Sequence, residues 1–179
     1  MIETFFKEGH IRTFSGKYIS VKNPDPLSVF VVDIAVGLAR EPRFGGHTKK
    51  PYSVAEHSIW CMQKAEEIYP QYPAFAFKCF LHDAHEAYLK DIPTPTKAEL
   101  PGYEVLAEMH QDAIHQRYCV SLTHIEKQMI KHIDKLALEW EIENKVLAWK
   151  GLELTDQARV DLFIHHFVQL CKLPFAIQP

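Results

Sequence analysis

The sequence lacks the features of membrane-spanning, secreted and nucleic-acid-coating proteins. No uninterrupted apolar run approaches the length of a membrane span. The segment Met1–Phe14 mixes charged and aromatic residues and lacks the apolar core of a signal peptide. The net charge is −3, whereas proteins that coat nucleic acid usually carry a basic surplus. These absences predict a cytoplasmic protein that binds neither a membrane nor nucleic acid, although a pocket with a few local cations could still bind a small anion.

The sequence also lacks a cysteine framework. Its four cysteines show neither a C-x-x-C spacing nor the pattern of a small secreted protein, and they are Cys61, Cys79, Cys119 and Cys171. We therefore expect reduced, mostly buried thiols. Histidine is the residue in surplus, with eleven copies, so position must identify the functional few.

Length and composition predict a single domain over residues 1–179. Hydrophobic residues make up 47% and charged residues 24% of the chain, which is typical of a folded globular protein. We find no internal repeat and no low-complexity linker. Residues 10–21 alternate around Ser15-Gly16, which predicts a β-hairpin, and the turn at Asn23–Pro26 ends it. Residues 1–24 are therefore interpreted as an N-terminal hairpin extension.

The rest of the chain has a helical pattern, and the predicted fold class is an all-α bundle with this small hairpin. The helices are expected near residues 29–41, 53–69, 75–88, 103–118, 123–148 and 156–171. Ser53 and Thr123 each begin a capping-box signature that ends in a glutamate three residues later. The third helix is expected to place its aromatic residues in the core, to run through His82-Asp83, and to be broken by Asp91–Pro95.

An adjacent His82-Asp83 pair within an apolar helix suggests a metal site. Burying both polar groups is costly unless something compensates them, and a divalent ion does so. Neutral imidazole and ionised carboxylate are standard ligands for such ions. Glu86 lies four residues beyond His82, so it is expected on the same helical face, where it could take a proton from an activated water.

His57 and Asp134 complete the candidate ligand set. His57 lies on the preceding predicted helix and Asp134 on a later one. Each residue alone is more often structural, but the order His…His-Asp…Asp on successive helices favours one divalent metal ion held inside a bundle. Mn²⁺, Co²⁺, Fe²⁺, Mg²⁺, Ni²⁺ and Zn²⁺ all remain open.

This order of ligands resembles the HD-domain phosphohydrolases, an all-α superfamily. The resemblance covers residues 25–143 and is closer to the bacterial 5′-deoxynucleotidase branch and its phage-type relatives. The stretches that carry it are Arg43-Phe-Gly-Gly-His47, Tyr52-Ser-Val-Ala-Glu-His57-Ser58, Leu81-His-Asp-Ala-His-Glu-Ala-Tyr88 and Asp91-Ile-Pro-Thr-Pro95.

The resemblance implies a role for each matching residue. It implies four metal ligands, which are His57, His82, Asp83 and Asp134. Glu86 would activate or orient the attacking water, and Asp91 would position water or protonate the leaving group. Three residues of one loop would bind substrate: Arg43 the phosphate, Phe44 the sugar, with His47 as a further candidate.

The implied activity is release of phosphate from (deoxy)nucleoside 5′-monophosphates by a metal-dependent enzyme. Two alternatives stay open. One is a dNTP triphosphohydrolase that releases tripolyphosphate, and the other is a non-catalytic nucleotide-sensing module. The expected partner is a small nucleotide, and related enzymes suggest a homo-oligomer.

Overall fold

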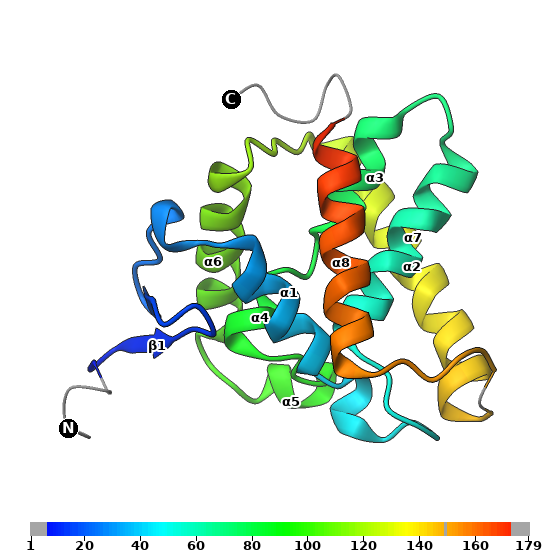
Figure 1. Cartoon of the computed structure of the whole chain (residues 1–179), viewed down its shortest axis with the longest axis horizontal. Coiled ribbons are helices and arrows are strands. Elements are labelled where there is room, and N and C mark those ends of the chain that lie inside the picture. The colour runs from blue at the N-terminus through cyan, green and yellow to red at the C-terminus, as the bar shows by residue number, and fades with distance from the viewer. Residues whose placement is uncertain (1–6, 149, 173–179) are drawn as a thin grey trace.

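The computed structural model of the protein describes residues 7–148 and 150–172. These residues are mostly helical, as predicted, and a two-stranded antiparallel sheet accompanies the helices (Figure 1). The α-helices are α1 Val31–Arg40, α2 Val54–Ile68, α3 Pro73–Phe80, α4 Glu86–Leu89, α5 Thr94–Ala98, α6 Tyr103–Arg117, α7 His124–Glu141 and α8 Asp156–Cys171. Among the helices of the described part, none combines the length and apolar character needed to cross a membrane.

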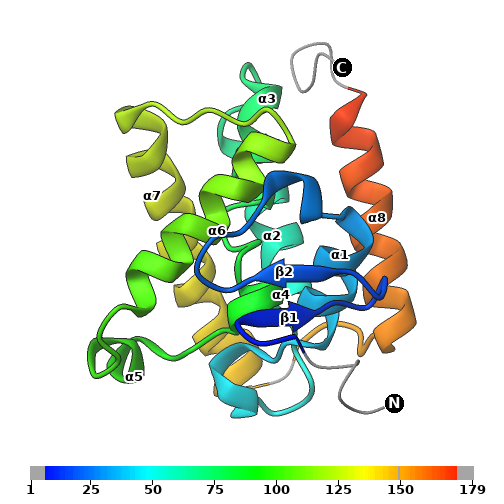
Figure 2. The same ribbon diagram turned by 90° about the vertical axis from the view of Figure 1, so that its left-hand side faces the viewer.

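The predicted hairpin is confirmed. Strand β1 (His10–Arg12) pairs with β2 (Tyr18–Ser20), and His10 lies opposite Ser20. Asp33 of α1 accepts hydrogen bonds from the backbone N–H of Ser15 at 2.7 Å and from its hydroxyl at 2.9 Å. This contact fastens the tip of the hairpin to the bundle, and Figure 2 shows the two strands on the side of α1 and α4.

Aromatic side chains of α3 form the centre of the core, as the sequence predicts. Phe75, Phe77 and Phe80 are almost fully buried. The ring of Phe80 stacks on that of Phe163 in α8, with 4.3 Å between centroids. The aromatic run therefore packs helices together.

Both predicted capping boxes are present. Ser53 and Thr123 each accept a hydrogen bond from a backbone N–H three residues later, and the glutamates at those positions bond back to the cap backbone. These local pairs satisfy backbone donors that the first turn of a helix leaves free. They therefore fix where the two helices that carry His57 and Asp134 begin.

The prediction that one helix runs through His82-Asp83 is wrong. Helix α3 ends at Phe80, a series of turns covers residues 81–85, and α4 begins at Glu86. Neighbouring residues in an α-helix point about 100° apart, so they cannot both face one site. The turns allow His82 and Asp83 to do so, and they also place Glu86, which does not reach the site through a shared helical face.

Helix α7 also ends earlier than predicted. It stops at Glu141 instead of near residue 148, and a π-helical turn, η3 (Ile142–Val146), follows it. The backbone N–H of Leu147 bonds to the carbonyl of Ile142 at 2.9 Å, five residues back. The amide of Asn144 caps the carbonyl of Trp140 at 2.7 Å. Such π turns widen the helix where side chains must be re-aimed.

Helix α5 was not predicted, and it begins inside the expected break at residues 91–95. The break itself is real, because the backbone leaves α4 through Lys90 in the left-handed region at φ 78°. Gly37 lets α4 lie very close to α1. A Cβ at that position would come within 2.8 Å of the Cβ and carbonyl oxygen of Ala87. Only glycine allows this approach, which sets the depth of Glu86.

Candidate metal centre

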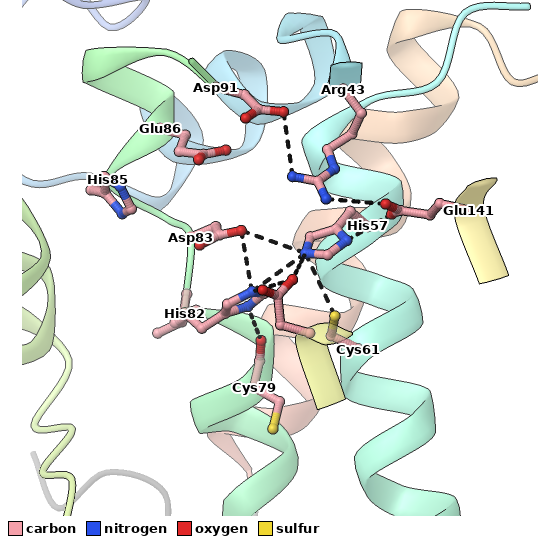
Figure 3. A network of polar contacts seen from close by, with 12 residues as sticks. Arg43, His57, Cys61, Cys79, His82, Asp83, His85, Glu86, Asp91 and Glu141 are labelled. Carbon is pink, nitrogen blue, oxygen red and sulfur yellow. Dashed lines mark hydrogen bonds and ion pairs between the residues drawn. The ribbon is translucent and has the colours of Figure 1, made fainter. Parts of the chain in front are cut away.

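The four predicted ligands lie together in the structure. Figure 3 shows three of them, His57, His82 and Asp83, pointing toward one another. His57 comes from α2, His82 and Asp83 from the turns after α3, and Asp134 from α7. Each residue offers one donor atom, and these atoms lie within 4.8 Å of one another. His57 Nε2 is 3.3 Å from His82 Nε2 and 3.3 Å from Asp134 Oδ1, and His82 Nε2 is 3.1 Å from Asp83 Oδ2.

Hydrogen bonds aim both imidazoles at this point. His82 Nδ1 donates to the carbonyl of Cys79 at 2.8 Å, and His57 Nδ1 donates to the carboxylate of Glu141 at 2.7 Å. Both Nε2 atoms are therefore free to present lone pairs to the same space, which is the arrangement of metal-binding histidines. Ligands about 2.0–2.2 Å from one ion lie roughly 3–3.5 Å from each other. The spacings of 3.1–3.3 Å given above match this, and His82 Nε2 lies slightly farther from Asp134 Oδ1, at 3.7 Å.

The charges around the cluster also fit a cation. The pKa of Asp83 is lowered, because the charge of His82 and the hydrogen bond from His57 outweigh the effect of burial. Burial alone would lower the pKa of His82, but Asp83 and Asp134 raise it by more, so the pKa is raised. The carboxylates thus attract positive charge. Protonating both histidines would place their Nε2–H groups against each other, whereas a divalent ion supplies positive charge without this contact.

A second group of residues could also hold an ion. It consists of His57, His82 and Cys61, whose Sγ lies 3.6 Å from His57 Nε2. All four cysteines are free thiols, as predicted, but only Cys61 and Cys79 are buried. Burial raises the pKa of the Cys79 thiol, which favours its protonated form.

A cavity of about 340 Å³ adjoins the cluster and contains most of the other predicted residues. Asp83 and Asp134 line it from the metal side. Its remaining lining residues are Arg43, Phe44, Glu86, Asp91, Ile92, Pro93, Thr94, Pro95, Lys97 and Leu138. His47 is exposed and does not line this cavity. The structure therefore brings together every predicted site residue except His47.

Glu86 is the buried acid of this cavity, with only 2% of its surface exposed. One carboxyl oxygen lies 3.5 Å from Lys97 Nζ, and the other has no hydrogen-bond partner among the described residues. Burial raises the pKa of Glu86 to about 9, and the charges of Asp83 and Asp91 act in the same direction. Such a group can hold a proton near neutral pH.

Comparison with known proteins shows the family. No family model matches the sequence. The uncharacterized protein YfdR of Escherichia coli (strain K12) is 37% identical over 131 residues, which cover 73% of this chain and 69% of YfdR. This chain belongs to the YfdR family. The uncharacterized protein RCAP_rcc00048 of Rhodobacter capsulatus is 33% identical over 138 residues, or 74% of this chain and 70% of that protein. Neither relative's name states an activity.

In this member of the YfdR family, Arg43 bridges two carboxylates beside the candidate metal ligands. Its Nη1 donates to Asp91 at 3.3 Å and its Nη2 to Glu141 at 3.0 Å, while its buried Nε has no partner among the described residues. Phe44, beside it, has a left-handed backbone at φ 56°, and its ring centroid lies 5.5 Å from the guanidinium. Strained non-glycine residues such as Phe44 often mark ligand sites.

Sequence reasoning missed Glu141, which the YfdR-family fold buries completely. Its carboxylate accepts from His57, from Arg43 and from the Tyr52 hydroxyl at 3.1 Å. One signal could have identified it, because Glu141 follows Asp134 by two helical turns and so shares a face of α7. Lys97 was also missed, and the sequence around it offers no comparable signal.

Proposed function

We propose that this chain is a divalent-metal-dependent phosphohydrolase that releases phosphate from (deoxy)nucleoside 5′-monophosphates. One observation supports this most strongly. Four ligand atoms converge beside a cavity that Asp83 and Asp134 line, and the same cavity contains a buried carboxyl group, Glu86, and a guanidinium, Arg43. Hydrolysis of a phosphate ester requires a metal site, a cation that binds the phosphate and an acid or base that transfers a proton.

The cavity is suited to a phosphate group. Arg43 offers a planar fork of donors, and Lys97 adds an ammonium group to the same cavity. These two cations face the carboxyl groups of Asp83, Glu86, Asp91 and Asp134, so the bare cavity is acidic. A divalent ion held by His57, His82, Asp83 and Asp134 would offset that charge, polarise a phosphate oxygen and lower the pKa of water.

Glu86 and Asp91 are the candidates for proton transfer. The unpartnered carboxyl oxygen of Glu86 is the atom that would exchange a proton with the attacking water. The pKa of Asp91 is raised by burial, although Arg43 opposes this, so Asp91 is suited to protonate the leaving oxygen. The preference for a nucleotide rests on the resemblance of the stretches Tyr52–Ser58, Leu81–Tyr88 and Asp91–Pro95 to the bacterial 5′-deoxynucleotidase branch.

The experiment is a substrate panel. Mn²⁺- or Co²⁺-loaded protein is incubated with ribo- and deoxynucleoside mono- and triphosphates, and the products are separated by chromatography. We expect nucleoside and orthophosphate from the (deoxy)nucleoside monophosphates. Tripolyphosphate from triphosphates would instead indicate a triphosphohydrolase. Metal binding without turnover would contradict an enzymatic function and leave the sensing module.

Two substitutions separate metal binding from chemistry. Asp83→Ala is expected to abolish both metal binding and turnover, because it removes a ligand. Glu86→Ala is expected to abolish turnover and to retain the metal, because Glu86 is not in the ligand set. Glu104→Ala, at an exposed position of α6, is the control and should change neither. Full activity of Glu86→Ala would exclude Glu86 from the mechanism.

A further inference from the structure

A second and larger cavity is lined by His82, one of the candidate metal ligands. Most of its other lining residues lie on α6 and α7, its volume is about 660 Å³, and it is called here the α6–α7 groove. Its lining residues are His82, Glu108, Gln111, Asp112, His115, Gln116, Val120, Leu122, Lys127, Ile130 and Lys131. His82 lines this groove, and its Nε2 is 3.1 Å from Oδ2 of Asp83. Asp83 in turn lines the 340 Å³ cavity that contains Arg43, called here the Arg43 cavity.

The groove has an apolar floor and a polar rim. Val120 and Leu122 are half-buried and Ile130 is buried, so they form the floor. The rim residues Glu108, Asp112, Gln116, Lys127 and Lys131 are exposed. Their two positive and two negative charges balance, so the groove does not favour an anion. An uncharged, flat ligand with polar edges matches this surface best.

His115 adds a directed hydrogen-bond donor to the groove. The side-chain oxygen of Gln111 accepts from the backbone N–H of His85 at 3.2 Å, and its nitrogen donates to the carbonyl of Leu81 at 2.7 Å. These two backbone contacts fix the orientation of the amide. Its nitrogen, 2.8 Å from His115 Nε2, must therefore donate to that atom.

Because Nε2 of His115 is an acceptor, the ring proton lies on Nδ1. Burial lowers the pKa of His115, which keeps the ring neutral. No described residue takes the Nδ1 proton in a hydrogen bond, so a ligand can accept it. Nucleobases carry ring nitrogens and carbonyl oxygens that accept such bonds.

We propose that the α6–α7 groove receives the base of the nucleotide whose phosphate lies beside Arg43. This inference rests on the proposed function and adds to it the position of the base. His82 lines the groove, and Asp83 and Asp134 line the cavity beside Arg43, so the proposal places one nucleotide across the ligand set with its phosphate on the cationic side. The apolar floor covers the faces of the base, and His115 and Gln116 contact its edge.

A matched pair of tryptophan variants tests the groove. Gln116→Trp places a large side chain in it, whereas Gln128→Trp makes the same substitution at an exposed α7 position that does not line it. We expect Gln116→Trp to raise KM for deoxynucleoside monophosphates roughly tenfold, which corresponds to about 1.4 kcal/mol of binding. KM for 2-deoxyribose 5-phosphate, which has no base, should not change, and Gln128→Trp should behave as the wild type.

A binding measurement on the wild-type protein gives an independent answer. Metal-free and Mg²⁺-loaded protein is titrated with the four deoxynucleoside monophosphates, and methyl chemical shifts are followed by NMR. The proposal expects shifts at Val120, Leu122 and Ile130. Shifts confined to Leu138, which lines the Arg43 cavity, together with an unaffected Gln116→Trp variant, would overturn the base position and leave the nucleotidase intact. Absence of both nucleotide shifts and turnover would overturn both proposals.

Discussion

Glu141 is the residue that connects the metal ligands to the candidate phosphate site. One oxygen accepts from His57 and Tyr52, and the other accepts from Arg43. Burial would raise the pKa of Glu141, but the charges of His57 and Arg43 lower it, so the group is ionised. An ionised carboxylate behind a ligating imidazole fixes the tautomer and increases the basicity of the ring.

Replacing Glu141 should therefore weaken metal binding without removing a ligand. We expect Glu141→Gln to lower the affinity for Mn²⁺ about 10- to 100-fold, the usual cost of losing such a partner. Isothermal titration calorimetry measures this directly. Glu139→Gln, at an exposed position of the same helix, is the control. Equal Mn²⁺ affinities of the wild type and Glu141→Gln would show that this carboxylate does not support the metal site.

The buried acid Glu86 should make the stability of the metal-free protein depend on pH. Its pKa is 4.5 in an exposed state and about 9 when folded. Between these values the folded state binds a proton that the unfolded state does not, so stability falls as pH rises. Glu86→Gln should remove this part of the slope, because an amide does not titrate.

Urea unfolding of metal-free protein at about pH 5, 7 and 9 tests this prediction. As pH rises, the free energy of unfolding of Glu86→Gln should increase relative to that of the wild type. Glu104→Gln, at an exposed α6 position, should keep the wild-type slope. Parallel pH profiles for Glu86→Gln and the wild type would mean that Glu86 ionises normally in the fold.

Short elements position three of the candidate site residues. The turns at residues 81–85 direct His82 and Asp83 to one point, and the four-residue helix α4 carries Glu86. A helical pattern in the sequence cannot show this interruption, because the apolar spacing continues across it. The contact between α1 and α4 at Gly37 then sets the position of α4.

Gly37→Ala should therefore disturb both stability and the site. The added Cβ would overlap backbone and side-chain atoms of Ala87, so α1 and α4 would have to separate. Overpacking of this kind costs about 1–3 kcal/mol of unfolding free energy, which urea titration measures. Turnover should fall as well, because α4 carries Glu86. Wild-type stability and rate would show that α1 and α4 separate without cost.

At the scale of the whole molecule, the candidate metal site joins parts of the chain that are distant in sequence. The ligands come from α2, the turns after α3, and α7. The carboxylate of Asp134 contacts His57, and that of Asp83 contacts His82. Metal binding should thus stabilise the complete fold, because the unfolded chain cannot assemble the four ligands.

We expect added Mn²⁺ to raise the melting temperature in a concentration-dependent way. Linkage predicts about 2.7 kcal/mol of stabilisation when free metal reaches about 100 times Kd. Differential scanning fluorimetry measures the shift. Asp134→Ala should abolish most of it, whereas Asp161→Ala, at an exposed position of α8, should retain it. The same shift in Asp134→Ala would place the ion elsewhere.

The sequence by itself determined most of the long helices, two of their caps and the candidate ligands, because these depend on apolar spacing, on bonds between near neighbours and on residue type. Ser53 and Thr123 cap as predicted, and the ligands His57, His82, Asp83 and Asp134 converge as their order suggested. Only the tertiary structure decided how that convergence is achieved. It set the turns after α3 and the π turn after α7, buried Glu141 against His57, brought Lys97 to Glu86 and formed the α6–α7 groove. These features depend on packing between elements, which no local sequence pattern records.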